Sequence, residues 1–202
     1  MARRTKEDAE KTKEMLLIAA EALFLEKGVA ATSLEDIARY AGMTRGAVYW
    51  HFENKQALFD AMHERVCLPF EVDFQQVTLS NTPTKALYDH CLYVLHQTVN
   101  DERVRNVMTI LLLKCEETDP NQSNVERIRR EREDLIEQFT TTFAKAQKMG
   151  EIAAKHNPQI IAITLHALMH GLLRDSVSYD YPYDMQAIAP QALDIFFGGL
   201  AA

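Results

Sequence analysis

Apolar residues recur at three- and four-residue spacing along most of this 202-residue chain. Before Gly28, for example, Leu16, Ala20 and Leu23 follow this repeat, which places them on one face of an α-helix. The chain contains only seven Gly and six Pro, too few for a collagen-like, disordered or β-rich protein. The sequence therefore predicts an all-α fold.

Start and stop signals divide the chain into about nine helices. Gly28 is a natural helix stop, Thr44 and Asn54 are typical N-cap residues, and Asn157-Pro158 is a common way to begin a helix. Pro69 lies inside the expected fourth helix, where it should produce a kink or a break. The expected helices begin near residues 7, 34, 45, 55, 83, 101, 125, 158 and 187.

The charge of the chain is spread unevenly. There are 22 Lys and Arg against 29 Asp and Glu, which gives a net charge of −7. Residues 1–65 hold 10 basic and 11 acidic side chains, whereas the rest of the chain holds 12 and 18. This balance argues against a protein that coats nucleic acid indiscriminately, but the first third can still present clustered cations to phosphates.

The sequence does not predict a membrane or secreted protein. Apolar runs fall short of the roughly 20 residues that cross a bilayer, and the charged start, residues 2–8, has no apolar segment behind it. We therefore expect a cytoplasmic protein without a membrane partner. Cys67, Cys91 and Cys115 are odd in number and lack C-x-x-C spacing, so buried reduced thiols are favoured over disulfides or metal ligands.

Signatures of catalysis are also missing from the sequence. We find no glycine-rich phosphate loop, nucleophile elbow, catalytic carboxylate pair or metal-binding motif. We therefore expect no enzymatic activity, no cofactor and no bound metal.

The second and third expected helices are separated by a tight turn that contains Gly42. Two short helices joined in this way form a helix-turn-helix, whose later helix can enter the major groove of DNA. The third helix offers few side chains to a core, and the others are polar or aromatic. We therefore divide the chain into a helix-turn-helix DNA-binding domain, residues 1–54, and a ligand-binding and dimerisation domain, residues 55–202.

The run from Thr44 to Lys55, TRGAVYWHFENK, resembles the DNA-binding domain of the TetR family of bacterial repressors. Upstream residues fit the same pattern, namely Gly28, Thr32, Leu34, Ile37, Ala38, Ala41 and Gly42. More narrowly, the opening Arg3–Lys6, the block TRGAVYWHF and the later Leu113–Glu116 are similar to the group of multidrug efflux pump repressors that includes AcrR, TtgR and MtrR. The rest of the C-terminal domain is similar only in its helical layout.

The resemblance implies that this region binds a palindromic operator in double-stranded DNA. Hydroxyls, rings and the Lys55 ammonium would hold phosphates, while Arg45 would read the edge of a guanine. Gly46 would allow close approach, and an arm at Arg3 and Arg4 would follow a neighbouring groove. The expected DNA-binding residues are Arg3, Arg4, Thr32, Ser33, Thr44, Arg45, Gly46, Tyr49, Trp50, His51 and Lys55.

Each of these residues also has a plain structural interpretation. Tyr49 and Trp50 could be core aromatics, His51 a helix cap, Arg45 a surface charge, and Arg3-Arg4 a solvated tail. Most of these interpretations would have to hold together on one short helix, so DNA binding is the preferred hypothesis.

In repressors of this family a small molecule enters the C-terminal domain. The expected lining consists of aromatic, sulfur-containing and polar-tipped side chains: Phe70, Phe74, Cys91, Met108, Leu112, Cys115, Phe139, Phe143, His166, Met169 and His170. Each of them could instead belong to an ordinary core. His166 and His170 could also bind a metal, although no third ligand is evident, or anchor a polar group of a drug.

The last two expected helices are apolar on more than one face, which predicts a homodimer formed through a four-helix seam. The favoured function is a repressor of a multidrug efflux operon that a small hydrophobic or cationic inducer releases from DNA. The fourth helix joins both domains and would transmit the signal. A repressor of a metabolic or other non-efflux operon, an activator, and a helical carrier or enzyme without DNA activity are the alternatives.

Overall fold

The computed structural model describes residues 6–115, 123–178 and 182–200. These residues form nine α-helices and one π-helical segment, so the all-α prediction is confirmed. The elements are α1 (Lys6–Lys27), α2 (Leu34–Tyr40), α3 (Arg45–His51), α4 (Lys55–Leu79), α5 (Pro83–Asn100), α6 (Glu102–Thr109), η1 (Ile110–Lys114), α7 (Ser123–Lys148), α8 (Pro158–Ser176) and α9 (Met185–Gly198).

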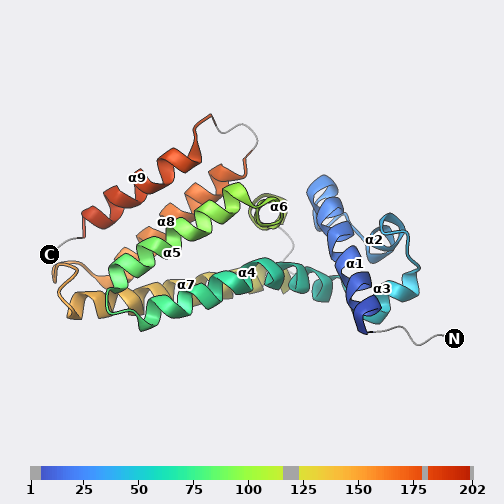
Figure 1. Ribbon diagram of the computed structural model, residues 1–202, viewed down its shortest axis with the longest axis horizontal. Helices are drawn as coiled ribbons and strands as arrows, with labels where there is room; N and C mark the ends of the chain where they lie inside the picture. Colours follow the sequence, from blue (N-terminus) through green and yellow to red (C-terminus); the bar gives the residue numbers. More distant parts are fainter. Residues whose placement is uncertain (1–5, 116–122, 179–181, 201–202) are drawn as a thin grey trace.

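The helices form two groups that share one long helix. Figure 1 shows α1, α2 and α3 together at one end of the molecule, and α5, α7, α8 and α9 stacked at the other. Helix α4 begins beside the small group and runs along the edge of the large one. A movement of α4 relative to the large group therefore also moves the small group.

Short helices of the small group are fixed by their caps. The Ser33 hydroxyl accepts a hydrogen bond from the Asp36 N–H, and the Asp36 carboxylate accepts one from the Ser33 N–H, which forms a capping box at the start of α2. The Thr44 hydroxyl accepts a hydrogen bond from the Ala47 N–H at 3.2 Å and caps α3. Gly28 follows α1 with φ of +82°, so it ends the helix in a left-handed conformation, as the sequence predicted.

Helix α4 is continuous over 25 residues. It begins where the Asn54 side chain accepts a hydrogen bond from the Ala57 N–H at 2.9 Å. The break suggested by Pro69 does not occur, because α4 continues through this residue. The exposed proline lies beside Val66 and Phe70, whose buried side chains keep both halves of α4 packed against the same core.

The expected single helix from Asp101 to Cys115 is divided into α6 and η1. A π-turn shifts the direction of the side chains that follow it. The Lys114 carbonyl at the end of η1 accepts a hydrogen bond from the Val29 N–H at 3.4 Å. The end of η1 therefore contacts the backbone just after α1 directly.

The core runs through both groups without interruption. Phe24 of α1 and Phe59 of α4 are fully buried, with ring centroids 6.2 Å apart. In the large group, the ring of Phe143 on α7 lies 6.5 Å from Phe196 and 6.4 Å from Phe197 of α9. Aromatic side chains thus join α4 to α1 of the small group, and α9 to α7 within the large group.

All three cysteines are free thiols; Cys91 is buried, as predicted, whereas Cys67 and Cys115 are only half-buried. Burial raises the pKa of Cys67 and Cys91 to about 12 and that of Cys115 to about 11, so these thiols are protonated and unreactive at neutral pH. Within the described ranges, no helix combines the length and apolar character of a membrane span. The same ranges contain no cluster of three His, Cys, Asp or Glu side chains that could hold a metal ion.

Substitution of Gly28 by alanine should destabilise the protein. A left-handed conformation costs a residue with a Cβ atom about 1–2 kcal/mol, so Gly28→Ala should lower the free energy of unfolding by about 1 kcal/mol in a urea titration. Gly46→Ala is the matched control, because Gly46 is helical and an added Cβ would approach no atom closer than 3.9 Å. The control should be neutral or more stable by up to about 1 kcal/mol; equal losses in both variants would contradict the role of Gly28.

Candidate functional site

Helix α3 turns most of its side chains away from the protein. Val48 is its buried residue and packs into the core, whereas Trp50 is 68% exposed. The exposed residues of the helix and its cap are Thr44, Arg45, Gly46, Tyr49 and Trp50. His51 is half-buried, and its ring meets that of Trp50 edge to face at 4.5 Å between centroids. Tyr49 and Trp50 are therefore not core aromatics.

Arg45 is held in place by two neighbours. Its Nε atom lies 3.0 Å from the Glu35 carboxylate on α2, and its guanidinium carbon lies 5.2 Å from the centroid of the Tyr49 ring. Hydrogen bonding to Tyr49, followed by the charge of Glu35, raises the pKa of Arg45. The sequence did not indicate the contact with Glu35, because Glu35 lies in a different helix.

Two expected phosphate contacts do not fit the structure. The Lys55 ammonium donates hydrogen bonds to the carbonyl oxygens of Val29 at 2.8 Å, Ala30 at 3.2 Å and Thr32 at 3.0 Å, which uses all three of its N–H groups. The Thr32 hydroxyl is buried and donates to the Gly28 carbonyl at 2.8 Å. Both side chains therefore secure the connection between α1 and α2 rather than face DNA.

The remaining expected DNA contacts lie at the edge of the α3 surface or outside the described residues. The Ser33 hydroxyl is exposed but donates to the Asp36 carboxylate at 2.6 Å. Arg3 and Arg4 lie outside the described residues, so their role stays a prediction. Tyr40, at the end of α2, is 59% exposed. The sequence prediction does not contain this exposed aromatic side chain, which lies on the same domain as α3.

Most of the expected ligand-binding residues are packed together in the large group. The buried ones are Phe70, Phe74, Cys91, Met108, Phe139, Phe143 and Met169. Leu112, Cys115 and His166 are half-buried, and His170 is exposed. The Phe74 ring lies 5.8 Å from that of Phe139 and 5.2 Å from that of His90. A molecule that binds among these rings has to displace some of them.

Polar groups near this aromatic cluster were only partly anticipated. His90, which the sequence did not suggest, is buried and contacts the Asp73 carboxylate through Nδ1 at 2.6 Å. The rings of His166 and His170 stack at 6.1 Å, but His170 faces outward. A separate hollow of about 320 Å³ opens between α5 and α9, and its lining includes none of the expected residues.

Helices α8 and α9 each leave large apolar side chains uncovered, two on α8 and one on α9. On α8, Ile161 and Leu165 are buried, whereas Ile160 and Ile163 are exposed by 59% and 44%. On α9, Ile195 is 79% exposed. Exposed isoleucines on two neighbouring helices are the kind of surface that a partner subunit covers.

Two family models match the chain. Residues 16–62 match the bacterial regulatory proteins of the tetR family, and residues 82–201 match the C-terminal region of MAATS-type transcriptional repressors. The chain belongs to the TetR family. It is therefore a DNA-binding transcriptional repressor of a non-enzymatic family whose members also bind small molecules.

Relatives of this TetR repressor include efflux regulators. It is 35% identical to the transcriptional regulator TtgR of Pseudomonas putida, over 86% of this chain and 84% of TtgR. NalD, the secondary repressor of the MexAB-OprM multidrug efflux pump in Pseudomonas aeruginosa, has a similar structure with a TM-score of 0.86 and 40% identity, over 97% of this chain and 98% of NalD. The complex of triclosan with SmeT, from Stenotrophomonas maltophilia, gives a TM-score of 0.85 and 32% identity, over 95% of this chain and 92% of SmeT.

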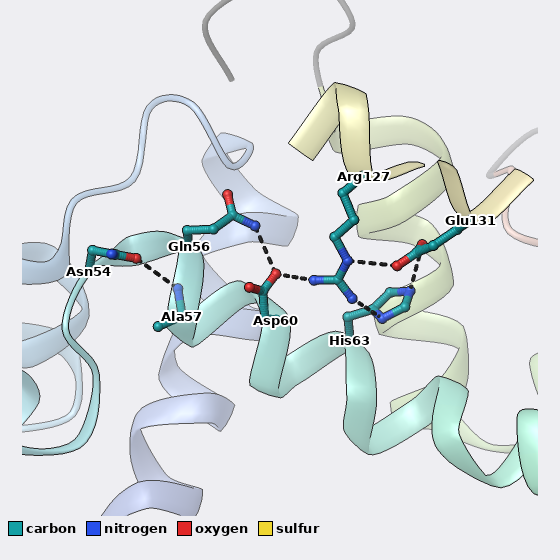
Figure 2. Close-up of polar contacts among 7 residues, drawn as sticks. All are labelled: Asn54, Gln56, Ala57, Asp60, His63, Arg127 and Glu131. Atoms are coloured by element: carbon teal, nitrogen blue, oxygen red, sulfur yellow. Dashed lines mark hydrogen bonds and ion pairs between the residues drawn. The ribbon is translucent and has the colours of Figure 1, made fainter. Parts of the chain in front are cut away.

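A polar cluster in this TetR repressor clamps the start of α4 to α7. Figure 2 shows Arg127 of α7 reaching across to Asp60 and His63 of α4. Arg127 pairs with the Asp60 carboxylate and donates from Nε to Glu131 at 2.6 Å, and Gln56 donates to Asp60 at 2.8 Å. We call Asp60, His63, Arg127 and Glu131 the α4–α7 clasp. Its α4 residues lie within three turns of the helix-turn-helix.

The contacts of His63 define its protonation. Arg127 Nη2 lies 2.6 Å from His63 Nδ1, and a guanidinium carries only donors, so Nδ1 accepts this hydrogen bond. The ring proton is then on Nε2, which faces Glu131 at 3.4 Å. Burial lowers the pKa of His63, against the opposing effect of Glu131. The imidazole is therefore neutral at pH 7 and completes the clasp as an acceptor.

A second ionic cluster links the helix-turn-helix to the large group. Arg65 of α4 donates to Glu14 of α1 at 2.8 Å and pairs with the buried Glu21. Arg103 of α6 donates to the other Glu14 oxygen at 2.8 Å. Burial lowers the pKa of Arg65, and its hydrogen bond to Glu14 opposes this change. Together with the α4–α7 clasp, this cluster fixes α4 relative to α1, α6 and α7.

Removal of Arg127 should destabilise the repressor more than removal of a neighbouring arginine. Arg127→Met leaves Asp60 and Glu131 without their cation, and hydrogen bonds to charged groups are worth about 1.5–3 kcal/mol. We expect a loss of about 1–3 kcal/mol in the free energy of unfolding, measured in urea. Arg129→Met is the control, because Arg129 is exposed and its contact with Glu133 is 3.7 Å long. It should cost less than about 0.5 kcal/mol, and similar losses in both variants would contradict the clasp.

Proposed function

We propose that this TetR repressor controls a multidrug efflux operon in the cytoplasm. It would bind a palindromic operator as a homodimer and leave it when a small hydrophobic or cationic inducer binds. The observation that carries the DNA-binding part is the outward orientation of Arg45, Tyr49 and Trp50 on α3. The efflux part is supported by the sequence and structural similarity to NalD and SmeT, whose described targets are efflux pumps.

The proposed DNA contacts are centred on α3. Arg45 reads a guanine edge, because a guanidinium can donate to O6 and N7 together. Gly46, which is exposed, allows the helix to approach closely. The residues proposed to hold the backbone are Ser33, Thr44, Tyr49, Trp50 and His51, together with the arm at Arg3 and Arg4. Thr32 and Lys55 support the α1–α2 connection from inside and make no contact with DNA in this proposal.

Two copies of the chain place two α3 helices on one face of the DNA. The exposed side chains of Ile160, Ile163 and Ile195 on α8 and α9 lie in the proposed seam. Recognition helices of such dimers must sit about one helical turn, roughly 34 Å, apart. The seam therefore determines whether both half-sites can be occupied.

Helix α4 carries the inducer signal in this proposal. Phe70 and Phe74 belong to the aromatic cluster of the large group, and Asp60 and His63 belong to the clasp beside the helix-turn-helix. An inducer that enters the cluster displaces rings attached to α4. This displacement shifts the two helix-turn-helix domains of the dimer, which we call the heads. Release follows as a population shift from a spacing that fits the operator to one that does not.

The purified chain should bind the DNA directly upstream of its own gene. Trp50 is the single tryptophan and is exposed, so its fluorescence should change on binding. If six to eight phosphates are neutralised per dimer, a plot of the logarithm of the binding constant against the logarithm of the salt concentration should have a slope of about −5 to −7.

Arg45→Ala should weaken binding to this DNA at least tenfold, whereas Arg129→Ala, on the exposed surface of α7, should leave it unchanged. Two results would contradict the α3 interface: Trp50 fluorescence that does not change at saturating DNA, or an affinity of Arg45→Ala for this DNA equal to that of wild type.

The kind of compound that releases the protein from this DNA distinguishes an efflux regulator from a metabolic one. Triclosan and a panel of cationic dyes should lower the affinity for the operator at micromolar concentration, and a panel of central metabolites should not. Release by metabolites alone would instead assign the repressor to a metabolic operon, while leaving the DNA interface intact.

Charge placed in the proposed seam should separate the subunits. Ile195→Glu puts a carboxylate into an apolar interface, which is strongly unfavourable when unpaired. We expect a monomer in sedimentation analysis and operator binding at least tenfold weaker. Leu79→Glu is the matched control, because Leu79 is 74% exposed at the far end of α4. A dimeric Ile195→Glu variant would argue against a seam through α9.

A further inference from the structure

The DNA-facing surface contains a negative charge whose position calls for an explanation. Glu35 is exposed in the first turn of α2, beside the outward face of α3. A carboxylate at this place is repelled by the phosphate backbone and lowers the affinity for every duplex. Its Oε1 atom lies 3.0 Å from Arg45 Nε. The charge therefore acts on the same side chain that we propose to read a base.

The two acidic residues of α2 have different partners. Asp36 caps the helix through Ser33 and pairs with Arg39. Hydrogen bonds from Ser33 lower the pKa of Asp36, so this carboxylate is committed to the capping box. Glu35 instead reaches across to α3. The Glu35–Arg45 pair therefore joins the two helices of the helix-turn-helix, whereas Asp36 serves α2 alone.

The contacts of the pair leave several donors of the guanidinium available. Arginine has five N–H donors in a planar fork. Glu35 lies at the Nε donor, and Tyr49, whose ring centroid lies 5.2 Å from the guanidinium carbon, also hydrogen-bonds to the guanidinium. The two terminal nitrogens are the edge that matches O6 and N7 of guanine. Because Glu35 and Tyr49 already restrain the guanidinium, the side chain loses less freedom when its remaining donors bind a base.

We propose that Glu35 is a specificity-determining residue that positions Arg45 toward one guanine in each half-site. This inference rests on the proposed function of α3. On a correct site, Arg45 contacts the guanine and Glu35 together. On other duplexes, Arg45 turns to a phosphate and leaves Glu35 unpaired beside the backbone. The carboxylate thus disfavours wrong sequences more than right ones, which is how repulsive elements create specificity.

The test selects binding sites from a random duplex library. Full-length wild type, Glu35→Gln, Glu53→Gln and Arg45→Ala each enrich 30-bp duplexes, and the binding ratio of guanine to other bases is measured at every position. Affinity for poly(dA-dT), which offers no guanine O6 and N7 pair, is measured in parallel. Glu53→Gln is the matched control, because Glu53 is exposed and lines the same shallow hollow as Glu35 and Tyr49. It removes an equal charge from the same domain without touching Arg45.

Wild type should show a guanine preference at one fixed position in each half-site. Glu35→Gln should reduce that preference by about fivefold or more at this position alone, while its affinity for poly(dA-dT) rises at least twofold. Glu53→Gln should raise affinity for all duplexes and keep the preference. The melting temperatures of all variants should equal that of wild type, which would show that the changes in base preference and affinity come from contacts with DNA and not from loss of folded protein.

The other outcomes separate two failures. If Arg45→Ala keeps every base preference, Arg45 reads no base, and the proposed role of α3 in base reading fails together with this inference. If Arg45→Ala loses the preference and Glu35→Gln keeps it, the proposed function stands and the positioning role of Glu35 is overturned. Equal effects of Glu35→Gln and Glu53→Gln would likewise reduce Glu35 to a general surface charge.

Discussion

The structure depends on one helix that packs into two groups of helices at once. Phe59 of α4 lies against Phe24 of the helix-turn-helix, and Phe74 lies against Phe139 of α7. Apolar contacts of this kind resist separation but have little directional preference. Polar clusters supply the missing direction, since the α4–α7 clasp and the Glu14–Arg65 contact allow few arrangements. The position of the heads is therefore fixed by groups that lie outside the DNA interface.

The fold could be predicted from sequence because its signals are local. Helix starts at Ser33, Thr44 and Asn157 depend on side chains that cap the backbone a few residues away. The stop at Gly28 depends on its own backbone conformation. One local prediction was wrong: the single helix expected from Asp101 to Cys115 is divided into α6 and η1. Of the kink or break expected at Pro69, the break does not occur, because α4 continues through this residue.

The candidate site was predictable only in outline. The outward face of α3 follows from its pattern of polar and aromatic residues around Val48. In contrast, the carbonyl oxygens that Lys55 binds lie 23 to 26 residues away in sequence, and Arg127 meets Asp60 across 67 residues. No local pattern reports such contacts. A lysine at the start of a helix beside a DNA-binding motif resembles a phosphate ligand until its partners are known.

The distribution of charge explains why a single face can bind DNA in an otherwise acidic protein. The chain beyond residue 65 carries six more acidic than basic side chains, so most of the molecule is repelled by a duplex. Lys55 is turned inward, and Arg45 is shared with Glu35, which removes cations that would otherwise hold any phosphate. In the proposed interface, affinity for random DNA is therefore low, and binding depends on the few contacts that α3 would make with bases. The proposed release by an inducer would then be easier, because a small shift of α4 would remove contacts that general electrostatic attraction does not replace.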